Sequence, residues 1–167
     1  MNPNIKSTDS IFLVTDDESI FSLTKDFFYK HDNLILSRYT TSNISRSIIN
    51  ESKCSLAIFT VDYSNWVKER DILKRNIELI KKLNKHTIVM LISNDPRIIH
   101  DNVVFSCDVD DILLYPCDDC SFGFRVLVNL SRYKHIHHMT TDVSLMRQKY
   151  DAHLSNVRAQ LEQIASI

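Results

Sequence analysis

Short apolar runs alternate with amphipathic segments along the first 133 residues of the chain. Five runs rich in Ile, Leu, Val and Phe are predicted to be buried strands: 10–15, 33–39, 56–61, 87–92 and 111–115. Apolar residues at helical spacing predict helices over 19–30, 44–51, 66–83 and 122–133, and a short helix or irregular piece over 96–105. Strands that alternate with helices predict an α/β fold with a parallel sheet covered on both faces. Five such units favour a flavodoxin-like (βα)5 domain of strand order 2-1-3-4-5, whose functional groups lie at the carboxyl ends of the strands.

The pattern changes after residue 133. Apolar residues then recur at seven-residue intervals at Ile136, Val143, Tyr150, Val157 and Ile164, and Leu154 and Leu161 add a second apolar position. Thr140 and Arg147 interrupt that second position in the first half, and no glycine or proline occurs from 131 to 167. The pattern predicts a long C-terminal helix and a homodimer through a coiled coil; the alternative is a helix that folds back onto the domain. The predicted organisation is a tail over 1–9, a domain over 10–133 and the helix over 134–167.

Composition narrows the function classes. The 167 residues carry a formal net charge of −1, so overall charge gives no reason to expect a nucleic acid or an anionic lipid as partner. No apolar run approaches the roughly 20 residues that a membrane helix needs, and the first ten residues are polar. We therefore expect a cytoplasmic protein with reduced cysteines. A single glycine in the whole chain disfavours phosphate loops and dinucleotide-binding turns.

Two strand ends resemble those of the receiver domains of bacterial two-component response regulators. The run Ile11–Ser19 is similar to the family's first strand, which ends in a paired-acid motif that holds a divalent cation; Asp16 and Asp17 are the corresponding acids here. The run Asp111–Pro116 is similar to the fifth strand, where the family has a lysine before a proline in a cis peptide bond. The resemblance covers residues 10–133. Acids also suit a helix N-terminus whatever the function, so Asp16 and Asp17 have a purely structural interpretation as well.

The middle of the sequence departs from the family. The phosphorylated aspartate of receiver domains corresponds to Thr60, and Asp62, two residues further on, is a reserve acceptor because it keeps the same side-chain parity. Ser93 is the nearest match to the hydroxyl residue that responds to phosphorylation, and Tyr115 stands in place of the lysine before Pro116. Aspartyl phosphorylation needs a carboxylate nucleophile, Mg²⁺ and a fixed cation. A threonine and a tyrosine supply neither the nucleophile nor the charge.

The resemblance implies a signalling role with three open forms. The leading one is a degenerate receiver without catalysis of its own, independent of phosphorylation, that acts by protein–protein interaction or dimerisation. In receiver-linked diguanylate cyclases a similar helix carries the dimer signal into an output domain. The second is an active receiver phosphorylated on Asp62 by a histidine kinase, with Mg²⁺ held by the acid pair; the third is an inert structural adaptor.

Cysteine and histidine clusters are weaker candidates. Cys117 and Cys120 have the spacing of half a zinc site, but the sequence has no second pair to complete it. His135, His137 and His138 would point in different directions on a helix, so a solvated junction explains them better than a shared metal.

Overall fold

The computed structural model describes residues 8–44 and 54–165, with only the backbone of 103, 105 and 156–165. The strands are β1 (Asp9–Val14), β2 (Leu34–Tyr39), β3 (Leu56–Val61), β4 (Ile88–Ser93) and β5 (Asp111–Leu114). The helices are α1 (Glu18–Tyr29), α3 (Trp66–Leu83), α4 (Asn102–Ser106) and α5 (Asp119–Ala165), with short 3₁₀ helices η2 (Tyr63–Asn65) and η3 (Pro96–His100). The predicted helix over 44–51 lies, apart from Ile44, outside the described residues. The segment 96–105 forms η3 and the start of α4.

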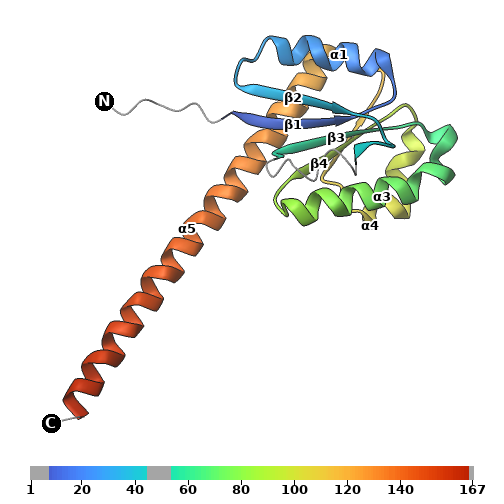
Figure 1. Cartoon of the computed structure of the whole chain (residues 1–167). Helices are drawn as coiled ribbons and strands as arrows, with labels where there is room; N and C mark the ends of the chain where they lie inside the picture. The colour runs from blue at the N-terminus through green and yellow to red at the C-terminus, as the bar shows by residue number, and fades with distance from the viewer. Residues whose placement is uncertain (1–7, 45–53, 166–167) are drawn as a thin grey trace. The chain divides into compact units, whose positions relative to one another are not determined.

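The strands form one parallel sheet in the order β2-β1-β3-β4-β5, which confirms the predicted flavodoxin-like fold (Figure 1). Val14 pairs with Tyr39 on one side and with Phe59 on the other, so β1 and β2 end at one level of the sheet and β3 runs two residues further, to Val61. On the other side of β3, Thr60 pairs with Ile92 of β4. The residues that follow these strands are thereby gathered at one edge.

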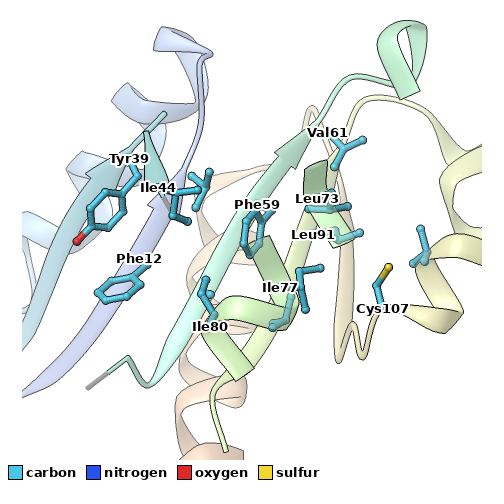
Figure 2. Close-up of a cluster of buried hydrophobic side chains, with 14 of the residues drawn as sticks. Phe12, Tyr39, Ile44, Phe59, Val61, Leu73, Ile77, Ile80, Leu91 and Cys107 are labelled. Atoms are coloured by element: carbon cyan, nitrogen blue, oxygen red, sulfur yellow. The ribbon is translucent and has the colours of Figure 1, made fainter. Parts of the chain in front are cut away.

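Alternate residues of the central strands enter two separate cores, one on each face of the sheet. Phe12 and Phe59 face the core under α3 and α4, where Figure 2 shows them with Ile77 and Ile80 of α3. Ile11 and Leu13 of β1 and Ile58 of β3 face the opposite core. Helix α1 and the first part of α5 cover this core. Burial of both faces explains why the strands read as continuous apolar runs.

A cluster of aromatic side chains joins α1 to α5. The ring of Phe122, with no exposed surface, meets Phe27 and Phe28 edge to face at centroid distances of 5.6 and 6.3 Å. Gly123 lies beside this cluster, and a Cβ placed on it would stand 2.6 Å from a ring carbon of Phe27. The only glycine of the sequence is therefore explained by close packing and not by an unusual backbone angle.

The chain divides into two compact units, with the division between Tyr133 and Lys134. Helix α5 runs through this boundary, so the predicted last domain helix and the predicted long helix are one element. In the first unit α5 contributes Phe122, Val126 and Leu130 to the core. None of the helices in the described part of the chain is both long and apolar enough to cross a membrane.

Candidate functional site

A pocket of about 440 Å³ opens at the carboxyl ends of β1, β3 and β4. Its lining is mostly polar and acidic and consists of Asp16, Asp17, Ile20, Thr41, Thr60, Val61, Asp62, Asn65, Glu69, Ile92, Asn94 and Tyr115. Four candidate residues from the middle and first strand ends, Asp16, Asp17, Thr60 and Asp62, thus come together in one place. We call this the strand-end pocket.

The two acids after β1 have different surroundings. Asp17 is the N-cap of α1: its Oδ1 accepts hydrogen bonds from the Ser19 amide at 2.8 Å, the Ser19 hydroxyl at 2.5 Å and the Ile20 amide at 3.3 Å. The hydrogen bond from the Ser19 hydroxyl, with those from the two amides, lowers the pKa of Asp17. Asp16 is exposed at the pocket wall. Asp17 therefore has the structural role that the sequence analysis gave as the alternative for these acids: it caps the N-terminus of α1.

A hydroxyl pair connects the ends of β1 and β3. The Thr60 hydroxyl donates a hydrogen bond to Oγ1 of Thr15 at 2.9 Å, and the Asp17 amide donates to the same oxygen at 3.0 Å. Thr15 is fully buried. Sequence reasoning overlooked Thr15, although its place directly before the acid pair was a usable signal. The hydrogen bond between the two threonine hydroxyls is thus one between uncharged groups.

The reserve acceptor Asp62 is the N-cap of η2. Its carboxylate accepts hydrogen bonds from the Ser64 hydroxyl at 2.7 Å, the Ser64 amide at 3.0 Å and the Asn94 side-chain amide at 3.3 Å. These donors, the Ser64 hydroxyl foremost, lower the pKa of Asp62. The side chain is exposed and borders the strand-end pocket. Asp62 thus lies at the same edge of the sheet as Thr60, but its carboxylate is hydrogen-bonded to Ser64 in the turn that follows β3.

The three predicted switch positions, Ser93, Tyr115 and Pro116, have different surroundings. Ser93 is buried at the end of β4, and its Oγ accepts a hydrogen bond from the Asp95 amide at 3.3 Å. Its neighbours Ile92 and Asn94, and not Ser93, line the pocket. Tyr115 lines the pocket, its amide donates to the Ser93 carbonyl at 2.8 Å, and its bond to Pro116 is cis, as the resemblance implied.

Glu69 of α3 is a pocket residue that sequence reasoning missed because it reads as one of many charges on a surface helix. Burial raises its pKa, and the negative charges of Asp62 and Asp16 raise it further. No lysine, arginine or histidine occurs among the described lining residues. The strand-end pocket is therefore an anionic environment.

We expect Glu69→Gln to stabilise the protein near pH 7. Because the pKa of Glu69 is higher in the folded state than its ordinary value of 4.5, ionising this carboxyl costs folding stability once the pH exceeds that value. The gain in urea midpoint should accordingly be present near pH 7 and shrink toward pH 4. Glu78→Gln, an exposed position on the same helix away from the pocket, is the matched control. An equal gain in both variants would show that Glu69 has no special environment.

The donor set does not fit a conventional Mg²⁺ site. Across residues 8–44 and 54–165, no three His, Cys, Asp or Glu side chains are grouped so that they could hold a metal ion. Thr60 supplies a hydroxyl at the third strand end, and one oxygen of Asp17 is already used by α1. Hard divalent cations prefer several carboxylate oxygens, which this arrangement does not converge.

A second surface stands out on α5 beyond Tyr133. Its exposed apolar side chains include Ile136, Met139, Val143, Met146, Tyr150 and Leu154. Their successive spacings are three, four, three, four and four residues, which places them along one side of the helix. Met139 and Met146 continue the apolar row through the first half of this segment, one residue before Thr140 and Arg147, the residues at which the sequence analysis found the second apolar position interrupted. We call this row the α5 seam; positions 157, 161 and 164 continue its spacing, but their side chains lie outside the described residues.

Comparisons with known proteins find the same fold. No protein-family model matches the sequence, and no curated protein matches it. Among solved structures, the signal receiver domain of an HD domain-containing protein from Pseudomonas fluorescens Pf-5 has a TM-score of 0.63 at 14% identity, over 79% of this chain and 93% of that one. An adenylate cyclase from Rhodopirellula baltica gives 0.61 at 13% identity over 82% and 98%. A CheY-like response regulator receiver domain protein from Methanospirillum hungatei JF-1 gives 0.60 at 16% identity over 77% and 98%. At these identities the likeness establishes a receiver-type fold.

Proposed function

We propose that this chain is an atypical receiver-like signalling module that works without phosphorylation and acts through protein–protein contact. The observation that carries the proposal is Thr60. It stands at the end of β3 and gives its hydroxyl proton to Thr15, where an active receiver would present a carboxylate to a phosphoryl donor. A neutral hydroxyl that donates its proton to another hydroxyl is a poor nucleophile at neutral pH.

The surroundings of Thr60 support the same conclusion. Transfer of a phosphoryl group requires positive charge around the developing oxygens. Tyr115 contributes a phenol at the pocket wall, and the acids Asp16, Asp62 and Glu69 contribute negative charge. The pocket thus opposes the charge that the reaction would bring in. No catalytic activity is proposed for the chain.

The contact surface proposed for this module is the α5 seam, with a second copy of the chain as partner. Met146, Met139 and Val143 are between 57% and 70% exposed, which leaves a row of large apolar groups in water. A helix with such a row at heptad spacing gains most by packing against another of the same kind. Dimerisation then takes the place of phosphorylation as the event that transmits a signal.

An active receiver phosphorylated on Asp62 by a histidine kinase is the second candidate, favoured by the position of Asp62 at the same pocket as Thr60. The proposed function predicts no phosphoryl adduct by intact mass after incubation with acetyl phosphate and Mg²⁺. A mass gain of one phosphoryl group that persists in Asp71→Ala, disappears in Asp62→Ala and is released by hydroxylamine would establish the second candidate instead. Asp71 is an exposed aspartate of α3 outside the pocket and serves as the matched control.

A further inference from the structure

A pocket of about 330 Å³ lies between α1 and β2 and shares no lining residue with the strand-end pocket. Its lining combines one stripe of α1 with alternate residues of β2, which point to one face of the sheet, and consists of Phe21, Lys25, Phe28, Tyr29, Leu34, Leu36 and Arg38. Helix α1 lies over β2, and β2 is the edge strand of the sheet, with β1 as its neighbour (Figure 1). We call this cavity the edge pocket.

The floor of the edge pocket is apolar. Phe28 and Leu34 are buried in the core that α1 covers, and Leu36 is half-buried against the same core. Phe21 and Tyr29 add aromatic rings to the lining. An apolar group that leaves water for such a floor gains free energy in proportion to its buried area. The floor therefore favours the hydrocarbon part of a ligand.

The charged residues of the lining are both cations. The ammonium of Lys25 stands 5.4 Å from the ring centroid of Tyr29, and the guanidinium of Arg38 stands 4.1 Å from that of Phe21. Among the described residues no carboxylate forms a salt bridge with Lys25, whereas Arg38 pairs at 2.7 Å with Glu18, an exposed residue outside the lining. A guanidinium has five N–H donors, so Arg38 keeps donors for a second anion.

We infer that the edge pocket binds a small amphiphilic carboxylate, with its hydrocarbon chain on the apolar floor and its carboxylate between Lys25 and Arg38. At about 30 Å³ for each non-hydrogen atom, the share of a molecule in liquid water, the cavity holds roughly eleven such atoms, close to a fatty acid of about ten carbons. The two cations select an anion over a neutral or cationic compound of the same length. This inference goes beyond the proposed function and does not depend on the dimer.

Isothermal titration calorimetry of the full-length chain with decanoate near pH 7 tests the inference. The dissociation constant should be on the order of 100 μM at low salt. Decyltrimethylammonium has the same chain length and the opposite charge, and it should bind at least about tenfold more weakly. Equal affinity for the two compounds would reduce the site to apolar contact and overturn the inference, as would a lack of decanoate binding at about ten times the expected dissociation constant.

Substitution of the two cations locates the bound carboxylate. Lys25→Gln and Arg38→Gln should each raise the dissociation constant for decanoate about fivefold without weakening decyltrimethylammonium. Lys68→Gln, at an exposed lysine of α3 outside the edge pocket, is the matched control and should stay within about twofold of wild type. Urea unfolding shows that each variant keeps its fold. Equal losses in Lys68→Gln and Lys25→Gln, or no loss in either lining variant, would contradict the assigned site.

Glu18→Gln should act in the opposite direction. Because Glu18 competes with the ligand for the guanidinium of Arg38, its removal should tighten decanoate binding about threefold, the range expected for an exposed ion pair. In an Arg38→Gln background the same substitution should lose most of this effect. Weaker or unchanged binding in Glu18→Gln would show that Arg38 does not contact the carboxylate and would overturn the assignment.

Discussion

Met146→Lys should raise the dimer dissociation constant on the order of 100-fold. Met146 lies within the α5 seam, so the substitution removes two apolar side chains from the contact between the two copies and brings two ammonium groups into it. Met146 is 70% exposed in the single chain, so the lysine costs the isolated chain little. Sedimentation equilibrium over a range of protein concentrations measures the loss directly.

The neighbouring residue provides a matched control. Leu145 is also large, apolar and exposed, at 49%, but its position falls outside the seam. Leu145→Lys should leave the dissociation constant within about twofold of wild type, since surface substitutions away from a contact have small effects. Equal dissociation by both variants would mean that general loss of apolar surface, and not the seam, controls association.

Gly123→Ala should lower the free energy of unfolding by about 1–3 kcal/mol, although alanine is the better helix former by up to about 1 kcal/mol. The added methyl would lie 2.6 Å from the Phe27 ring. That ring has little room to move, because it stands edge to face with both Phe28 and Phe122. Urea unfolding at a fixed protein concentration measures the difference.

A double-mutant cycle identifies the cause. In a Phe27→Leu background the ring is absent, so Gly123→Ala should become neutral or stabilising as helix propensity takes over. If the alanine lowers stability equally in both backgrounds, close approach to Phe27 is not the reason for the glycine.

The sheet was predictable from the sequence because its strands are buried on both faces. Runs such as Ile11–Val14 and Ile88–Ile92 contain almost no polar residue, so both strand existence and parallel pairing could be inferred from them. The change of pattern after residue 133 was predicted as well, from the heptad spacing that begins at Ile136. The continuity of α5 across Tyr133 was not predicted, although the residues around Tyr133 include no glycine or proline.

The candidate site was predictable in location but not in detail. The ends of β1 and β3 gave Asp16, Thr60 and Asp62, all of which line the strand-end pocket. Glu69 escaped prediction because its approach to the pocket depends on how α3 packs, which one-dimensional spacing does not contain. Thr15 directly precedes the acid pair, but its hydrogen bond with Thr60 joins two strands and so depends on the fold.

The absence of lysine, arginine and histidine from the described lining of the strand-end pocket bears on the kinetics of encounter. Carboxylates that line a concave surface focus a negative potential outward into the solvent. Small phosphate-bearing molecules approaching the ends of β1 and β3 would be slowed by that potential before any chemistry could begin. The pocket thereby lowers the association rate of anionic ligands relative to neutral or cationic ones, and higher ionic strength would reduce this difference.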